Sequence, residues 1–241
     1  MKVGRKLRDL FFPPRCVFCD RVISRREHPV CPACIEPPPP HIIETACPRC
    51  GREKRLYCTC KRDTFLSDRI AAPFYFEGAV KNGIHRFKKV EDVDRTRYFA
   101  DEMCETAFRE FGDLRIDYVT AVPMSRRTYR DRGFNQAERL ARLLSKDFHV
   151  PYVDLLVKRM ETGSQKGLKA DERRVNLLGV FDVDTRLPLT GKQILLIDDV
   201  VTTGSTTNEC AKMLKLAGAE KVYVLALALT RPKNDKETES R

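Results

Sequence analysis

Residues 194–206 constrain the fold of this chain more than any other segment. Residues 194–197 are consecutive aliphatic side chains, which indicates a buried strand of a parallel sheet. Asp198 and Asp199 follow at once, and the next turn combines several hydroxyl side chains with Gly204. From residue 205 onward, apolar residues recur at helical spacing. The sequence therefore predicts a strand, two acids at its carboxyl end, a turn and a helix in direct succession.

The turn after the two acids has the composition of a phosphate site. A helix N-terminus offers unpaired N–H groups and partial positive charge, and Gly204 lets the backbone approach an anion. Two neighbouring carboxylates suit ribose hydroxyls and a hard cation such as Mg²⁺. An ordinary capped turn after a core strand is the alternative. We predict a sugar-phosphate ligand and the following candidate residues: Asp198, Asp199, Val200, Val201, Thr202, Thr203, Gly204, Ser205 and Thr206.

Eight of the ten cysteines lie between residues 16 and 60, in four close pairs. In a reducing compartment such spacing indicates zinc rather than disulfides, and two pairs complete one tetrahedral site. We expect one zinc at Cys16, Cys19, Cys31 and Cys34, and a second at Cys47, Cys50, Cys58 and Cys60. Ligation interleaved between the two sets remains open.

The chain has no apolar run long enough to span a bilayer, and its first residues do not form a signal peptide. We therefore expect a cytoplasmic protein. A peripheral anchor at the inner membrane face, formed by residues 1–12, is an alternative. The formal net charge of +11 favours anionic partners, which include phosphorylated small molecules, nucleic acid and acidic membranes.

The pattern changes after the cysteines to alternating strands and helices. This alternation predicts an α/β fold with a mostly parallel sheet between helices. We expect a cysteine-rich unit over 1–62, an α/β domain over 63–232 and a charged tail over 233–241. The predicted strands lie near residues 69–77, 117–122, 154–159, 178–183, 193–197 and 221–229, and the predicted helices near 80–88, 94–111, 134–147 and 205–217.

A second loop, residues 123–132, follows a predicted strand and is crowded with arginines. Guanidinium groups bind diphosphate oxygens in a bidentate manner, so the arginines of this loop are candidates for binding a leaving diphosphate: Arg126, Arg127, Arg130 and Arg132. A solvated basic loop or a nucleic-acid patch is the alternative.

These segments carry a family resemblance. Residues 194–206 resemble the phosphoribosyl-pyrophosphate (PRPP) loop of type I phosphoribosyltransferases. Arg-Gly-Phe-Asn-Gln at 132–136 resembles the signature of ComF-type proteins, which are associated with bacterial DNA uptake, and the paired cysteines ahead of it agree. The resemblance covers nearly the whole chain.

The resemblance implies a type I phosphoribosyltransferase fold behind a double zinc ribbon, with PRPP and Mg²⁺ as ligands. Asp198 and Asp199 would contact ribose and metal, and residues 160–177 would form a flexible lid. A non-proline cis peptide bond is expected between Met124 and Arg127. The implied catalytic residues are Asp198, Asp199 and Arg132, and the PRPP site would also include Ser125, Arg126, Arg127 and Lys88.

Thr202 stands where purine-salvage enzymes often carry an acid, so the sequence identifies neither an acceptor nor a general base. Two functions remain open. One is transfer or sensing of phosphoribosyl groups. The other is a single-stranded-DNA-binding accessory protein of transformation, with stacking surfaces at Tyr57, Phe65 or Tyr129. The zinc ribbons are also candidates for docking proteins of the DNA-uptake machinery.

Overall fold

The computed structural model describes residues 13–24, 29–42, 46–54, 58, 60, 65–159, 179–184 and 186–232. The expected lid at 160–177, the N-terminal residues 1–12, Tyr57 and the charged tail lie outside these ranges. In the part of the chain that is described, no helix is both long enough and apolar enough to span a membrane.

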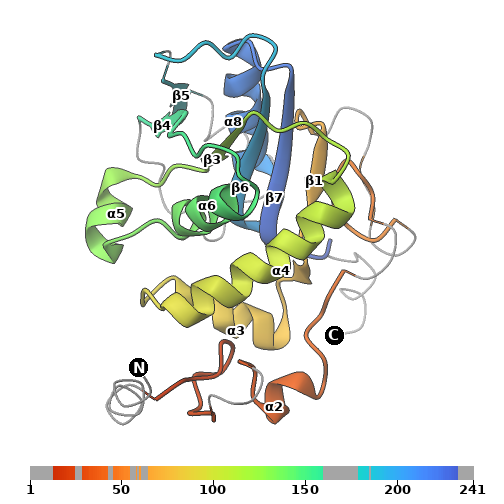
Figure 1. The fold of residues 1–241 in the computed structure, drawn as a ribbon, viewed down its shortest axis with the longest axis vertical. Helices are drawn as coiled ribbons and strands as arrows, with labels where there is room; N and C mark the ends of the chain where they lie inside the picture. Colours follow the sequence, from red (N-terminus) through yellow and green to blue (C-terminus); the bar gives the residue numbers. More distant parts are fainter. Residues whose placement is uncertain are drawn as a thin grey trace, which may run out of the picture.

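A parallel sheet forms the centre of the protein (Figure 1). Every pairing within it is parallel, which confirms the predicted fold class. Pro73 interrupts the first predicted strand, because proline has no N–H to donate to a ladder. The strand order is β1 (Arg69–Ala71), β7 (Lys221–Leu229), β6 (Gln193–Val201) and β3 (Tyr118–Ala121), and β2 (Phe74–Tyr75) also pairs with β7.

Helices cover both faces of this sheet, as expected. Side chains alternate along β6, so Leu195 packs on one face with α4 and α6, and Leu196 packs on the other with α8. The four predicted helices are confirmed within a few residues of their expected ends. They are α3 (Gly78–Phe87), α4 (Val93–Phe111), α6 (Gln136–Asp147) and α8 (Ser205–Leu216).

Two features differ from the sequence expectations. The arginine-rich segment expected as a loop contains a helix, α5 (Arg126–Arg132), which begins after Ser125 and ends at Gly133. The Ser125 hydroxyl accepts the N–H of Thr128, and Gly133 takes a left-handed φ of +85° that favours glycine. In addition, β4 (Leu156–Lys158) and β5 (Phe181–Val183) pair antiparallel in a small sheet of their own. Their sequences give no signal that separates them from the main sheet.

The cysteines form two clusters, with the membership that their spacing predicted. The first cysteine cluster is Cys16, Cys19, Cys31 and Cys34, and the second cysteine cluster is Cys47, Cys50, Cys58 and Cys60. In each cluster the ligand atoms lie within 4.8 Å of one another, so the interleaved alternative is wrong. A short helix, α2 (Pro32–Ile35), carries Cys34.

Candidate functional site

The two acids lie within β6 rather than after it. β6 continues through Asp198 and Asp199 to Val201, because its neighbour β7 also continues and pairs with Val200 and Val201. The expectation that the strand ends before the acids is therefore wrong. The acids still lie at the carboxyl side of the parallel sheet, where open α/β folds bind ligands.

Lys88 meets one of these acids from another part of the chain. It follows the last residue of α3, and its Nζ lies 3.0 Å from Oδ2 of Asp199. Both side chains are partly buried, which screens the pair less than a surface pair. The structure thus joins Lys88 to the acidic pair that the sequence placed in the same site.

Asp198 lacks such a cation partner among the described residues. Burial and the Asp199 carboxylate raise the pKa of Asp198 to about 8, although the Asp199 N–H donates to its Oδ1 at 2.8 Å. Two adjacent carboxyl groups and one ammonium form an oxygen-rich site, in which a cation would displace the proton that Asp198 holds because of its raised pKa. This chemistry fits a hard divalent cation such as Mg²⁺.

The turn between β6 and α8 brings hydroxyl and N–H groups together. Gly204 has a φ of +79°, and a Cβ at this position would collide with the ring of Phe65. The Thr203 and Ser205 hydroxyls lie 2.8 Å apart, at the start of α8. The first N–H groups of α8 have no intrahelical acceptor, so this end of the helix suits an anion. We call residues 202–206 the phosphate loop, and α8 begins within it at Ser205, where its sequence predicted a helix start.

The arginines of α5 do not all converge. Arg126, Arg127 and Arg130 are exposed, and none has a carboxylate within ion-pair distance among the residues described here. Arg132 is half-buried, and its Nη1 donates to Oε1 of Gln136 at 2.6 Å. Arg132 is thus tied to the start of α6.

Ser125 lies at the start of α5, where its backbone is extended. The expected cis peptide bond between Met124 and Arg127 is wrong, since the cis bond in the described chain is Glu36–Pro37. The chain enters α5 through trans peptide bonds, with the backbone of Ser125 in an extended conformation.

Arg52 is a residue of this site that the sequence did not reveal. It follows the Cys47/Cys50 pair, is 9% exposed, and reaches the phosphate loop. Its Nη2 donates to the carbonyl oxygen of Thr202 at 2.8 Å, and its Nε donates to that of Thr230 at 2.7 Å. Its position directly after Cys50-Gly51 is the only sequence signal, and that signal does not specify a contact with a loop so far along the chain.

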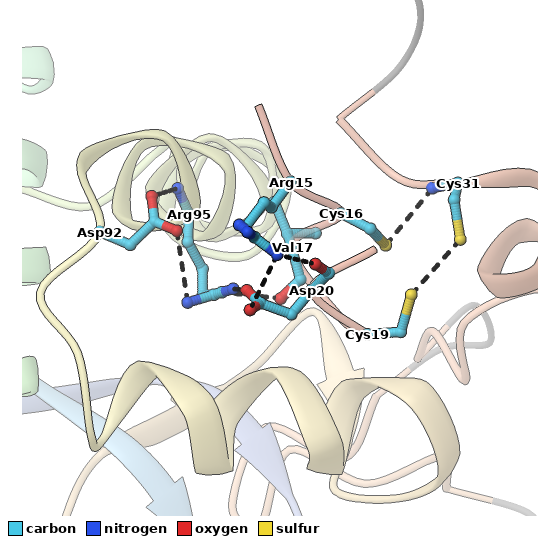
Figure 2. Close-up of polar contacts among 8 residues, drawn as sticks. All are labelled: Arg15, Cys16, Val17, Cys19, Asp20, Cys31, Asp92 and Arg95. Carbon is cyan, nitrogen blue, oxygen red and sulfur yellow. Dashed lines mark hydrogen bonds and ion pairs between the residues drawn. The ribbon is translucent and has the colours of Figure 1, made fainter. Parts of the chain in front are cut away.

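The first cysteine cluster is joined to the α/β domain by a different arginine (Figure 2). Arg95 of α4 is 2% exposed. Its Nε donates to the carbonyl oxygen of Val17 at 2.8 Å, and its guanidinium pairs with Asp20 and Asp92. We call the segments that carry the first and second cysteine clusters the first and second ribbons. Both ribbons therefore contact the α/β domain directly.

The thiols of each cluster differ in their pKa values. Burial raises the pKa of a thiol, but backbone hydrogen bonds overcome this effect at Cys16 and Cys47 and lower both pKa values to about 7. Burial raises the pKa of Cys50 to about 11 and raises that of Cys34 well above its usual range. Four thiols this close ionise together only beside a cation, which is the chemistry of a tetrahedral zinc site.

Comparisons with known proteins match both parts of the chain. Residues 7–65 match the family described as a double zinc ribbon domain, and residues 130–241 match the phosphoribosyl transferase domain. The chain is 31% identical to competence protein ComFC of Streptococcus pneumoniae over 212 residues, which cover 88% of this chain and 86% of that protein. It is 29% identical to competence protein F of Haemophilus influenzae over 229 residues, with 90% and 98% covered.

The chain is also similar to DNA utilization protein YhgH of Escherichia coli K12, with 29% identity over 230 residues and 92% and 99% covered. Among solved structures, the glutamine PRPP amidotransferase from B. subtilis has a TM-score of 0.36 at 21% identity, with 54% of this chain and 25% of that chain covered. The adenine phosphoribosyltransferase of Saccharomyces cerevisiae has a TM-score of 0.36 at 14% identity, with 62% and 82% covered.

Proposed function

The chain belongs to the ComF family of competence proteins, with a double zinc ribbon and a type I phosphoribosyltransferase domain, and we propose that it binds PRPP with Mg²⁺ and transfers or senses phosphoribosyl groups. One observation carries this proposal. Lys88 pairs with Asp199 at 3.0 Å beside Asp198, at the end of the strand that leads into the phosphate loop. Carboxylates for a ribose and a metal thus lie next to donors for a phosphate.

In this proposal the ribose phosphate lies at the N-terminus of α8. The hydroxyls of Thr203 and Ser205 and the first N–H groups of the helix donate to its oxygens. Asp198 and Asp199 accept from the ribose hydroxyls, and Lys88 orients Asp199.

Departure of diphosphate would give the anomeric carbon oxocarbenium character. When bound, Mg²⁺ would neutralise charge on the diphosphate oxygens. The exposed guanidinium groups of Arg126 and Arg127 are available to the same oxygens. Thr202 provides no carboxylate for proton transfer, so any proton would move through another group or through the acceptor itself.

Calorimetric titration of PRPP with Mg²⁺ tests the proposal. We expect wild-type protein to bind, and Asp198→Ala to lose Mg²⁺-dependent binding. Asp113→Ala, which removes an exposed acid at the end of α4, is the control and should bind as wild type does. Unchanged affinity in Asp198→Ala would rule out this assignment of the site.

A specific observation also favours the second function, binding of single-stranded DNA. Arg126, Arg127 and Arg130 are exposed on α5 beside Tyr129, which is 47% exposed. Cations that track a backbone and an aromatic ring that stacks on a base are the usual elements of such a surface. Phe65, another candidate for stacking, is partly buried, and its ring lies against Gly204 of the phosphate loop.

Anisotropy of labelled single-stranded DNA at increasing salt tests this function. Replacing the three α5 arginines with glutamine should weaken binding and reduce its salt dependence. Replacing Arg109, Arg115 and Arg186 removes the same charge elsewhere and is the matched control. Equal loss in both variants would show that only net charge matters.

Both functions are proposed for a cytoplasmic protein, since clusters of free thiols need a reducing compartment. The ribbons are the surface that we propose for contact with proteins of the DNA-uptake machinery. The names of the curated relatives, which refer to competence and DNA utilization, support this context.

A further inference from the structure

The two ribbons begin with the same backbone turn. In residues 16–21 the N–H of Cys16 donates to the carbonyl oxygen of Arg21 at 2.8 Å, and in residues 47–52 the N–H of Cys47 donates to that of Arg52 at 2.8 Å. Asp20 and Gly51 hold the matching left-handed position, with φ values of 68° and 72°. An arginine therefore ends both turns at an equivalent place.

The two arginines have different surroundings. Arg21 is exposed, whereas Arg52 is buried against the α/β domain and binds the carbonyl oxygens of Thr202 and Thr230. Gly51 permits this docking. A Cβ on Gly51 would lie 2.9 Å from both Ile70 O and Leu229 Cδ1, so the second turn approaches β1 and β7 too closely for any other residue.

The contact lies at the base of the phosphate loop. The carbonyl oxygen of Thr202 accepts from Arg52 at 2.8 Å and from the hydroxyl of Thr230 at 3.2 Å. The next residues along the chain are Thr203 and Gly204, which supply a hydroxyl and the close approach at the start of α8. A guanidinium has a rigid fork of donors, so Arg52 holds two segments of backbone in one relative position.

We propose that Arg52 is a positioning residue for the phosphate loop, and that this loop and the second cysteine cluster are thermodynamically linked through it. The inference rests on the proposed function in that the ligand of the loop is the phosphate of PRPP. Because a coupling free energy is reciprocal, a ligand on the loop also stabilises the second cluster in its metal-binding form. The first cluster has no such contact with the loop among the described residues, since Arg21 is exposed and Arg95 docks that ribbon on α4.

Substitutions at the two equivalent arginines test the positioning role. Arg52→Met should weaken PRPP binding about tenfold, within the usual range for coupled sites. Arg52→Lys should recover part of the affinity, because an ammonium can reach one carbonyl oxygen but cannot bridge both in a fixed geometry. Arg21→Met should bind as wild type does. Full affinity in Arg52→Met would overturn the inference.

A measurement on wild-type protein covers the case in which Arg52→Met does not fold. The rate of maleimide alkylation is read for each cysteine by peptide mass spectrometry, with and without PRPP and Mg²⁺. We expect ligand to slow alkylation of the second cluster about fivefold, at the lower end of typical coupling, and to change the first cluster much less. No protection, or equal protection of both clusters, would overturn the linkage.

Ribose 5-phosphate separates this inference from the proposed function, since it occupies the loop without a diphosphate. If PRPP fails to bind and ribose 5-phosphate protects the second cluster, the proposed function fails and the linkage holds. If PRPP binds without protecting the second cluster, the function holds and the linkage fails. If neither ligand binds, both are wrong.

Discussion

Nζ of Lys88 lies 3.0 Å from Oδ2 of Asp199 and thereby joins the end of α3 to the carboxyl end of β6. Asp198 beside it has no cation within ion-pair distance among the described residues, and its pKa is raised. The site thus has one carboxylate that is paired with an ammonium, and one carboxyl group that holds a proton which a bound cation would displace.

Lys88→Met should weaken PRPP binding about tenfold, because Asp199 then loses a partly buried charge partner. The measurement is calorimetric titration with PRPP and Mg²⁺. Lys89→Met is the matched control, since Lys89 is the next residue and is exposed. Equal affinity in the two variants would mean that the Lys88–Asp199 pair does not contribute to the site.

Asp198→Asn should stabilise the protein in magnesium-free buffer, and the gain should grow with pH. The pKa of Asp198 rises from 3.8 to about 8 on folding, so the folded state holds a proton that the unfolded state has released. The stability of wild type associated with this group is fully present below the lower value and is lost as pH rises through the higher one.

We therefore expect the Tm gain of Asp198→Asn to be larger at about pH 8.5 than at about pH 6. Asp113→Asn, an exposed acid, should show no such trend. A gain that does not depend on pH would contradict the raised pKa. The same variant should lose PRPP binding, so stability and function change in opposite directions.

Gly204→Ala should destabilise the fold by about 2 kcal/mol, since it adds left-handed strain and a clash with Phe65. Gly191→Ala separates the two causes, because Gly191 has a similar φ of +70° and no atom lies within 4 Å of the position that its Cβ would take. We expect that control to cost about 1 kcal/mol. Urea denaturation measures the free energy of unfolding of both variants. Equal losses of stability would show that the Phe65 ring moves aside at little cost in free energy.

Arg95→Met should cost about 2 kcal/mol, because it removes an ion pair with Asp20 and a buried hydrogen bond to the carbonyl oxygen of Val17, which then lacks a donor. The control on the same helix is Arg97→Met, whose ion pairs with Asp101 and Asp147 are partly exposed and should be worth less than about 1 kcal/mol. The same two variants can be compared by alkylation of Cys16. Faster alkylation in both would indicate a general loss of stability.

Zinc removal should destabilise the α/β domain together with the first ribbon. Phe18 is fully buried and packs on Phe74, Tyr98 and Phe99, so the first ribbon shares a core with α4. We expect a chelator to lower the Tm of the main calorimetric transition. If the ribbon unfolded in a separate transition and the main transition were unchanged, the shared core would not be needed for the stability of the α/β domain.

Much of the candidate site could be predicted from short stretches of sequence. The order of strand, acids, turn and helix in β6 and α8 depends on hydrophobic periodicity and on one glycine, and both are local. The membership of the cysteine clusters depends on spacing that closes a metal site within one ribbon. The helix α5 was missed because a run of arginines has no apolar face, and the cap at Ser125 decides its start.

The parallel α/β class, the phosphate loop and the two cysteine clusters follow from the order of residues alone, because each depends on residues that are close together in the chain. The contact of Lys88 with Asp199, and the binding of the phosphate loop by Arg52 rather than Arg21, arise only in the folded protein. These contacts join segments that are distant in the chain. The residues around Lys88 or Arg52 do not indicate which distant group each will contact. That choice depends on burial and on an available carbonyl oxygen, which arise only when the sheet and the ribbons pack together.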